Sequence, residues 1–326
     1  MTKSKLLGLL AGGIASLAVA GLPAAAGAAD KSVAITAIVE HPALDAARQG
    51  ILDELAAQGF KEGENLTVSF QTAQGEFPTA VQIAKKYLGE KPDVIIGIST
   101  PSAQAIAANA GPEQKIVFTA VTDPVGAKLV SNNEKPGANI TGMSDMSPIS
   151  KHLELITRIT PAAKRIGIIY NSGEANSRSL VELLKSAAPT YGMTIVEGVA
   201  TNSNEVRPAA RSLAGKVDAI YVPTDNTAVS AFESILQVGY DGQIPVYSGD
   251  TDSVARGAVA ALGFNYYDVG RQTGVIVAKV LNGANPGDIA VEQVQKLELH
   301  INPASAAKMG VTIPDAIKAE AFKTIE

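Results

Sequence analysis

The sequence predicts an α/β protein made of two doubly wound, Rossmann-like lobes that are joined by a hinge of several strands. Short apolar runs alternate with longer amphipathic segments along the chain. This order is typical of parallel sheets that are covered by helices on both faces. The series occurs twice, over residues 33–119 and again over residues 165–247. Two similar units of this kind can close on a molecule that lies between them.

The first series begins with VAITAIV at residues 33–39, an apolar run typical of a buried strand. Residues 43–58 place apolar side chains at helical spacing, and Gly59 follows as a helix terminator. The later segments of this series are predicted strands at 65–70, 93–98 and 115–119, and predicted helices at 78–88 and from Pro101.

The second series repeats the pattern. Its predicted strands are residues 165–170, 194–199, 217–222 and 244–247, and its predicted helices are 175–189, 205–214 and 227–238. A helix at 265–281, a strand at 294–301 and a short helix at 304–309 follow. The polar stretches 137–146 and 249–257 are predicted linkers. We therefore assign residues 31–143 and 252–285 to lobe 1, and residues 144–251 and 286–326 to lobe 2.

The N-terminus has the pattern of a secretory signal peptide. Lys3 and Lys5 precede an apolar segment at 6–22, and small residues follow from Ala24 to Ala29. This order predicts a cleavable signal over residues 1–28, whereas a retained membrane helix is disfavoured by the short, glycine-containing segment. The chain has no cysteine, so it has no residue for a lipid anchor or a disulfide. A periplasmic location is predicted, with free secretion as the alternative.

Composition and motifs disfavour several classes of function. The net charge of −5, without any block of Lys and Arg, is not that of a nucleic-acid-binding protein. No G-x-S-x-G, G-x-G-x-x-G or P-loop motif is present, and none of the three histidines pairs with another at metal-ligand spacing. His152 lies in a helical run, HLELITRI, where a surface or boundary position is expected. We predict no catalysis, no metal and no cofactor.

Polar side chains follow nearly every predicted strand, at the edge where open α/β sheets bind ligands. Each group alone could be an ordinary helix N-cap. Together, the groups from both lobes predict a cleft for a small polar molecule. The candidate ligand-binding residues are Glu40, Ser99, Thr100, Ser102, Thr122, Asp123, Glu174, Asn176, Ser177, Asp225, Asn226 and Asp250.

The charges at these strand ends favour an amino acid as the ligand. Acidic residues predominate, and Arg178 is the nearest basic residue. Helix N-termini can hold a carboxylate without an arginine, while a carboxylate such as Asp225 or Glu174 can hold an ammonium group. Phosphate and sulfate fit less well, and the absence of Trp disfavours a sugar.

Together, HPALDAARQGILDELAAQGF, TPSAQA, TDPVGA, YNSGEANS and PTDNT resemble ABC-transporter substrate-binding proteins with the type I periplasmic binding-protein fold, in particular the family that includes tryptophan- and tyrosine-type binding proteins. The resemblance covers the chain from Lys31 onward. It implies a two-lobe trap that delivers its ligand to an ABC permease with a cytoplasmic ATPase. It also implies that Ser99, Thr100, Ser102 and Thr122 hold the ligand from one lobe, and Glu174, Asn176, Ser177, Asp225, Asn226 and Asp250 from the other.

The ligand implied by this resemblance is an aromatic amino acid. Phe264, Tyr266 and Phe77 are the candidate apolar walls, although each could equally be a core residue. A branched-chain amino acid, a small aromatic acid and a nucleoside-like molecule remain alternatives. A sensor domain for a membrane receptor would use the same fold, and a secreted hydrolase would require folding to bring His41 to the serines. A monomer is expected of a diffusing carrier.

Overall fold

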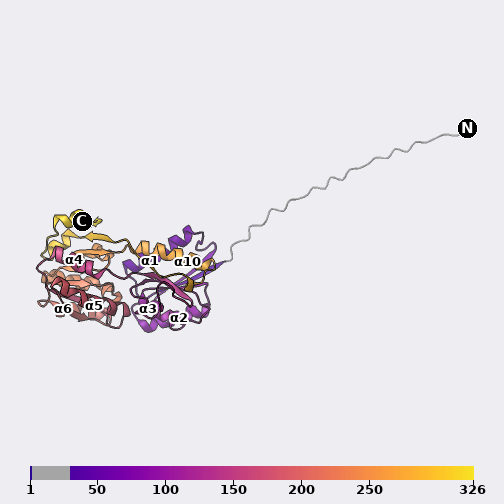
Figure 1. Ribbon diagram of the computed structural model, residues 1–326, viewed down its shortest axis with the longest axis horizontal. Coiled ribbons are helices and arrows are strands. Elements are labelled where there is room, and N and C mark those ends of the chain that lie inside the picture. Colours follow the sequence, from indigo (N-terminus) through magenta and orange to yellow (C-terminus); the bar gives the residue numbers. More distant parts are fainter. Residues whose placement is uncertain (2–29) are drawn as a thin grey trace.

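Two lobes lie side by side in the computed structural model, which describes Met1 and residues 30–326 (Figure 1). The predicted signal peptide, residues 1–28, lies outside the described residues apart from Met1. Each lobe is one sheet with helices on both faces, as the sequence predicts. No helix in the described part of the chain combines the length and apolarity needed to cross a bilayer.

The first lobe contains a six-stranded sheet in the order β11-β5-β4-β3-β1-β2, and all its neighbouring strands are parallel. Its strands are β1 (Lys31–Ala37), β2 (Leu66–Thr72), β3 (Val94–Ile98), β4 (Ile116–Val121), β5 (Ile140–Ser144) and β11 (Glu292–Gln293). Helices α1 (Pro42–Ala57) and α10 (Tyr266–Leu281) cover one face, and α2 (Phe77–Glu90) and α3 (Thr100–Ala107) cover the other (Figure 1). A 3-10 turn, Pro286–Asp288, precedes β11.

The second lobe contains a seven-stranded sheet in the order β13-β12-β10-β9-β8-β6-β7, in which only the β10–β12 pair is antiparallel. Its strands are β6 (Arg165–Tyr170), β7 (Thr194–Val199), β8 (Ala219–Val222), β9 (Val246–Ser248), β10 (Ala260–Gly263), β12 (Glu298–Ile301) and β13 (Lys323–Thr324). Its helices are α4 (Ile149–Ile159), α5 (Ala175–Ala187), α6 (Ser203–Leu213), α7 (Asn226–Ser230), α8 (Phe232–Gly242), α9 (Asp252–Arg256), α11 (Pro303–Lys308) and α12 (Asp315–Glu320), with a 3-10 turn at Ala188–Tyr191.

The chain passes between the lobes three times, at residues 145–148, 264–265 and 294–297. The first crossing immediately follows β5, a buried strand in a stretch that was predicted to be a linker. The second predicted linker, 249–257, contains α9 and stays within the second lobe. Both stretches are rich in glycine and short polar residues, and this composition hides the structure they form.

The sheets also place two strands differently from the predicted ranges of the lobes. Strand β10 pairs with β9 and β12 in the second sheet, although its residues fall in the range 252–285 that was assigned to lobe 1. Strand β11 pairs with β5 in the first sheet, although it falls in the range assigned to lobe 2. Both strands are short, so the sequence gives little periodicity by which to assign them.

Helices α1 and α10 pack unusually closely because glycines lie at their contact. A Cβ atom on Gly270 would lie 2.0 Å from the carbonyl oxygen of Ala47, and one on Gly50 would lie 2.2 Å from that of Tyr267. The apolar faces of these helices bury Leu44, Ile51 and Val269 against the first sheet. This packing fixes the start of each helix, where cavity-lining residues are found.

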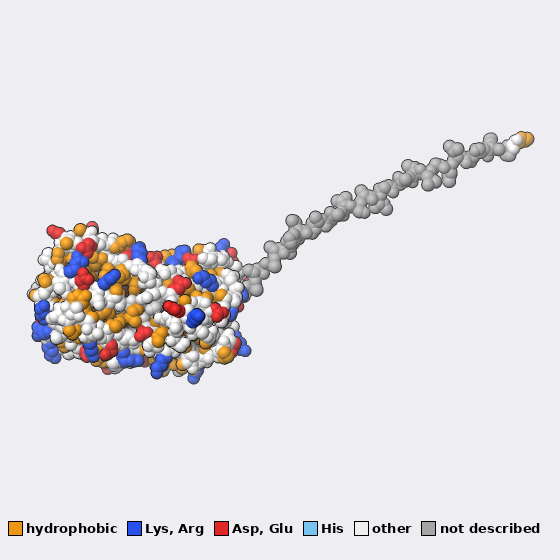
Figure 2. Space-filling view, viewed as in Figure 1, with side chains coloured by type: hydrophobic (Ala, Val, Ile, Leu, Met, Phe, Trp, Pro, Cys, Tyr) orange, Lys and Arg blue, Asp and Glu red, His pale blue; other side chains and the backbone are white. Residues whose placement is uncertain are grey.

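The face of the molecule seen in Figure 2 carries acidic and basic side chains that are interspersed with one another.

The core of the second lobe contains a buried histidine. His152 is 3% exposed, and its Nδ1 lies 2.6 Å from the hydroxyl of Tyr221. The expectation of a surface or boundary position for His152 is therefore wrong. Burial lowers the pKa of His152 to about 4, so the ring is neutral in the core.

Candidate functional site

A small cavity of about 20 Å³, lined almost entirely by buried residues, lies between the lobes, at the carboxyl ends of strands from both sheets. The first lobe and the crossing that leaves it contribute His41, Ala43, Leu44, Ala120, Thr122, Asp145 and Tyr266. The second lobe contributes Asn176, Thr224, Asp225, Asn226, Val229 and Asp250. The cavity lies at the edge where ligands of open α/β sheets bind.

Five of the twelve predicted ligand-binding residues line this cavity: Thr122, Asn176, Asp225, Asn226 and Asp250. Tyr266, one of the candidate apolar walls, also lines it. The second candidate wall, Phe264, is 5% exposed in the core of the first lobe, and the third, Phe77, is 48% exposed. The cavity therefore uses one of the three aromatic residues that the sequence suggests.

Glu40 and Glu174 line an adjoining open groove between the lobes, together with Phe77. Asn226 lines both the groove and the cavity, so the two hollows are neighbours. Asp123 lies in neither. Its carboxylate caps its own turn by accepting from the Gly126 N–H at 2.8 Å, and it accepts a hydrogen bond of 3.2 Å from Ser179 of the opposite lobe.

Ser99, Thr100 and Ser102 lie at the start of α3 and are almost completely buried. Their three hydroxyl oxygens have no hydrogen-bond partner within the described residues. Ser99 also has a φ of 75°, a strained value for a residue other than glycine. Strain and unpartnered buried hydroxyls both occur at ligand sites more than elsewhere, although these residues do not line the cavity.

Asp225 is completely buried and caps helix α7. Its carboxylate accepts hydrogen bonds from the Ala228 N–H at 2.6 Å, the Asn171 N–H at 2.6 Å and the Ser177 hydroxyl at 2.5 Å. Ser177 thus holds Asp225 and does not itself line the cavity. Burial, and to a lesser extent the nearby Glu174 carboxylate, raise the pKa of Asp225 to about 7. A cation in the cavity would favour the ionised form of Asp225.

Glu174 fixes the amide side chains at the mouth of the cavity. Its Oε2 accepts from the Asn226 Nδ2 at 2.5 Å and from the Asn176 Nδ2 at 3.1 Å, while its Oε1 accepts from the Thr227 hydroxyl at 3.0 Å. With its amide nitrogen held in this way, Asn176 is left with an Oδ1 that has no hydrogen-bond partner among residues 30–326. Since Asn176 lines the cavity, that oxygen is available to a ligand that donates a hydrogen bond.

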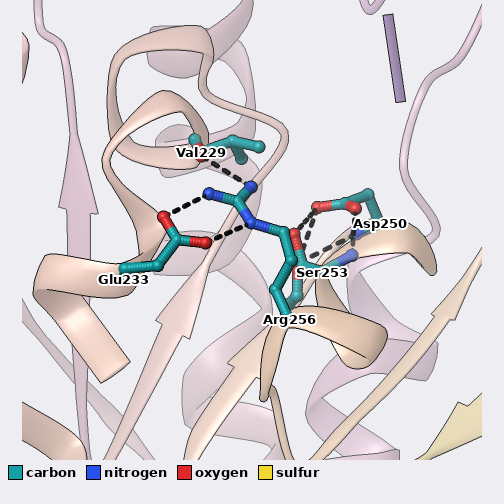
Figure 3. Close-up of polar contacts among 6 residues, drawn as sticks. Val229, Glu233, Asp250, Ser253 and Arg256 are labelled. Atoms are coloured by element: carbon teal, nitrogen blue, oxygen red, sulfur yellow. Dashed lines mark hydrogen bonds and ion pairs between the residues drawn. The ribbon is translucent and has the colours of Figure 1, made fainter. Parts of the chain in front are cut away.

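Asp250 is held without a positively charged partner. Its carboxylate accepts from the Ser248 hydroxyl at 2.8 Å, the Ser253 hydroxyl at 2.7 Å and the Ser253 N–H at 2.8 Å. Figure 3 shows the nearby Arg256 guanidinium bound instead to Glu233, at 2.7 Å through two nitrogens, and to the Val229 carbonyl at 2.8 Å. Arg256 therefore does not neutralise Asp250.

Asp145 is the third carboxylate of the cavity and was not predicted from the sequence. It accepts from the Tyr266 hydroxyl at 2.6 Å and from the Thr122 hydroxyl at 3.3 Å. Burial raises the pKa of Asp145. Asp145 was missed because it lies in the stretch predicted to be a linker, although it directly follows strand β5. The position of Asp145 directly after a strand was the feature by which it could have been predicted as a site residue.

The cavity thus combines three carboxylates with hydroxyls, amides and a few apolar side chains. Among the residues that the structure describes, no Lys or Arg lines it. His41 lines it too, and neither nitrogen of its ring takes part in a hydrogen bond with any described residue, a serine hydroxyl included. Across residues 30–326, His, Asp and Glu do not gather in a group of three that could hold a metal ion. The arrangement can bind a small molecule that carries a positive charge.

Comparisons with known proteins agree with this geometry. A family model described as ABC transporter substrate binding protein matches residues 32–325. A tyrosine-binding protein of Clostridioides difficile is 43% identical over 272 residues, which are 83% of this chain and 79% of the relative.

Two solved structures are similar over 91% of this chain. An ABC domain from Streptococcus pneumoniae in complex with L-Trp has a TM-score of 0.88 at 34% identity, and all of that chain is covered. A ligand-free, open substrate-binding protein with adhesive properties from Clostridium difficile has a TM-score of 0.68 at 41% identity, and 99% of that chain is covered.

Proposed function

The chain belongs to the family of ABC transporter substrate binding proteins, and from that premise we propose that it captures an aromatic amino acid between its two lobes. The observation that carries this proposal is the cavity with the carboxylates of Asp145, Asp225 and Asp250, in which no lining residue of the described chain is Lys or Arg. Such a cavity suits an ammonium group, because an ionised carboxylate at low dielectric interacts strongly with a cation.

The other groups of an amino acid also have candidate partners. The Thr122 hydroxyl lies in the cavity wall, and the unpartnered hydroxyls of Ser99, Thr100 and Ser102 lie at the N-terminus of α3. A helix N-terminus favours an anion, so we assign the ligand carboxylate to this side. Glu40, Glu174 and Ser177 support the site from its edge, and Asp123 joins the lobes through Ser179.

The apolar part of the wall favours an aromatic side chain. Ala43 and Leu44 in the first turn of α1, Val229 in α7 and the Tyr266 ring form this part of the lining. The relatives point the same way, since one is named a tyrosine-binding protein and another was solved with L-Trp.

We infer that the two lobes stand in a closed arrangement. The chain has the higher TM-score, 0.88, with the L-Trp complex and only 0.68 with the open, ligand-free protein, although the open protein is the more similar in sequence. If sequence divergence alone determined the TM-scores, the open protein, which is the more similar in sequence, would have the higher score. We infer that the lobes move as bodies about the three crossings, at residues 145–148, 264–265 and 294–297.

We extend the proposal to the partners and the location. The closed protein delivers its ligand to an ABC permease with a cytoplasmic ATPase, it acts as a monomer, and it reaches the periplasm through a cleaved signal at residues 1–28. It performs no catalytic step and takes no cofactor. The membership of the family and the pattern of residues 3–29 support these assignments.

A thermal-shift screen of the purified protein against the natural amino acids tests this function. A ligand that binds only the folded state raises Tm by an amount that grows with the logarithm of its concentration relative to its Kd. We expect L-Trp or L-Tyr to give the largest shift. If no amino acid raises Tm, the proposal is overturned.

A further inference from the structure

His41 is a buried histidine whose ring takes part in no hydrogen bond with any described residue. It lies between β1 and α1 as the N-cap residue of α1, and its side chain makes no capping bond. It is 9% exposed and lines the cavity. The Nδ1 atom is fully buried without a partner. A buried polar atom without a partner costs about 1–3 kcal/mol, so a bound ligand is the natural source of one.

The ring of His41 is neutral. Burial lowers its pKa to about 4; the Asp250 carboxylate acts in the opposite direction and Arg256 in the same one. A neutral imidazole always carries one nitrogen that donates and one that accepts. Near neutral pH, His41 therefore supplies the cavity with a hydrogen-bond acceptor that bears no charge.

The neighbours of His41 are apolar on the side of its own helix. Ala43 and Leu44 follow it in the first turn of α1, and both line the cavity. The three carboxylates come from other elements: Asp145 from a crossing, and Asp225 and Asp250 from the ends of β8 and β9. An uncharged acceptor beside an apolar wall suits an aromatic ring that carries one polar hydrogen.

We propose that His41 determines which aromatic amino acid is bound, by accepting a hydrogen bond from a ring-borne donor, either the phenol O–H of tyrosine or the indole N–H of tryptophan. L-Phenylalanine has no such donor, so its ring would leave the buried acceptor unpaired. A site built to bond a polar hydrogen discriminates strongly against an analogue that lacks it. This inference rests on the proposed function and adds the residue that sets its specificity.

The test compares L-Tyr, L-Trp and L-Phe by titration calorimetry on the wild type and three variants. His41→Leu removes the acceptor and keeps an apolar side chain of similar length. His41→Gln keeps an acceptor. His300→Leu is the control, because His300 lies outside the cavity and contacts Glu298.

The wild type should bind L-Tyr or L-Trp about 10- to 100-fold more tightly than L-Phe, as expected for one unpaired buried acceptor. His41→Leu should abolish this preference by weakening the binding of the preferred ligand, L-Tyr or L-Trp. Its affinity for L-Phe should stay within about threefold of that of the wild type. His41→Gln should retain part of the preference, and His300→Leu all of it. If His41→Leu does not fold, the wild-type preference and the His41→Gln variant still decide the outcome.

Equal affinity of the wild type for all three ligands would overturn the inference but not the proposed function. An equal loss for all three ligands in a folded His41→Leu variant would also overturn it, because His41 would then act on the shared part of the ligand. A wild type that binds none of the three would instead overturn the proposed function, and this inference with it.

Discussion

The phenol of Tyr266 donates a 2.6 Å hydrogen bond to the carboxylate of Asp145, and this bond joins two of the three crossings between the lobes. Asp145 is the first residue of one crossing, and Tyr266 begins α10 directly after another. Both residues also line the cavity. A ligand that touches this pair therefore contacts the hinge itself, which links binding to the closure of the lobes.

Replacement of Tyr266 by Phe removes this bond and keeps the ring in the cavity wall. Asp145 is then left with the weak 3.3 Å bond from Thr122. We expect the free energy of unfolding to fall by about 1–3 kcal/mol, as for other buried groups that lose a partner, and the ligand affinity to fall about tenfold. Urea denaturation and calorimetry measure the two effects.

The neighbouring residue offers a matched control. Tyr267 donates its hydroxyl to Asp53 at 2.8 Å and lies outside the cavity. Tyr267→Phe should leave the ligand affinity unchanged. If Tyr266→Phe bound as tightly as the wild type, the hinge pair would have no part in binding.

Asp225→Asn tests the carboxylate that we assign to the ligand ammonium group. Asparagine keeps an acceptor oxygen for the cap of α7, whereas alanine would remove all three hydrogen bonds that Asp225 accepts. We expect affinity to fall more than tenfold in a folded protein, in line with the strength of a charge-assisted bond. The exposed Asp241, which accepts from Gln237, gives the control variant Asp241→Asn. If Asp225→Asn and Asp241→Asn bind the ligand with equal affinity, Asp225 has no part in binding.

The stability of the unliganded protein should depend on pH through Asp225. Burial and Glu174 raise its pKa to about 7, whereas the unfolded value is near 4. The folded protein therefore binds the proton more tightly, and this contribution to stability is lost as the pH rises from about 4 to about 7. His41 and His152 have lowered pKa values and act in the opposite direction over much of this range.

Comparison with a variant isolates the contribution of Asp225. The free energy of unfolding of the wild type, relative to that of Asp225→Asn, should decline between pH 4 and pH 7, because the histidine contributions cancel in the difference. Chemical denaturation at several pH values measures it. A difference that is flat or that rises with pH would mean that Asp225 stays ionised in the empty protein.

The contact between α1 and α10 should be intolerant of any side chain at Gly270. A Cβ there would lie 2.0 Å from a backbone oxygen, so Gly270→Ala must separate the helices, and we expect a loss of about 1–3 kcal/mol. Gly89 in α2 has open space around it, and Gly89→Ala should be neutral or stabilising by about 0.5–1 kcal/mol. Thermal unfolding of both variants checks the contrast, and equal effects would contradict it.

Periodicity predicted the regular elements of the fold well. Strands β6 and β7 begin and end where the apolar runs at 165–170 and 194–199 do. Strand β5 was missed because its sequence, ITGMS, is short and contains a glycine on which a Cβ would lie 2.0 Å from the carbonyl oxygen of Phe118. The predicted helix at 227–238 divides into α7 and α8 at Ala231. Such details depend on packing that no local pattern records.

The polar strand ends predicted a cleft, but not which residues enclose it. Asp225 and Asp250 were found because strand ends carry ligand groups, and both line the cavity. Ser177 looked equivalent, yet its hydroxyl is donated to Asp225. Whether a side chain faces a ligand or supports a neighbour depends on its direction, which spacing alone does not define.

Calorimetric titration of the purified protein with L-Trp and L-Tyr tests the central claim most directly. We predict saturable binding of at least one of them with one site per chain, and its loss by more than tenfold in Asp225→Asn. The failure of both amino acids to bind the folded wild-type protein would contradict the account.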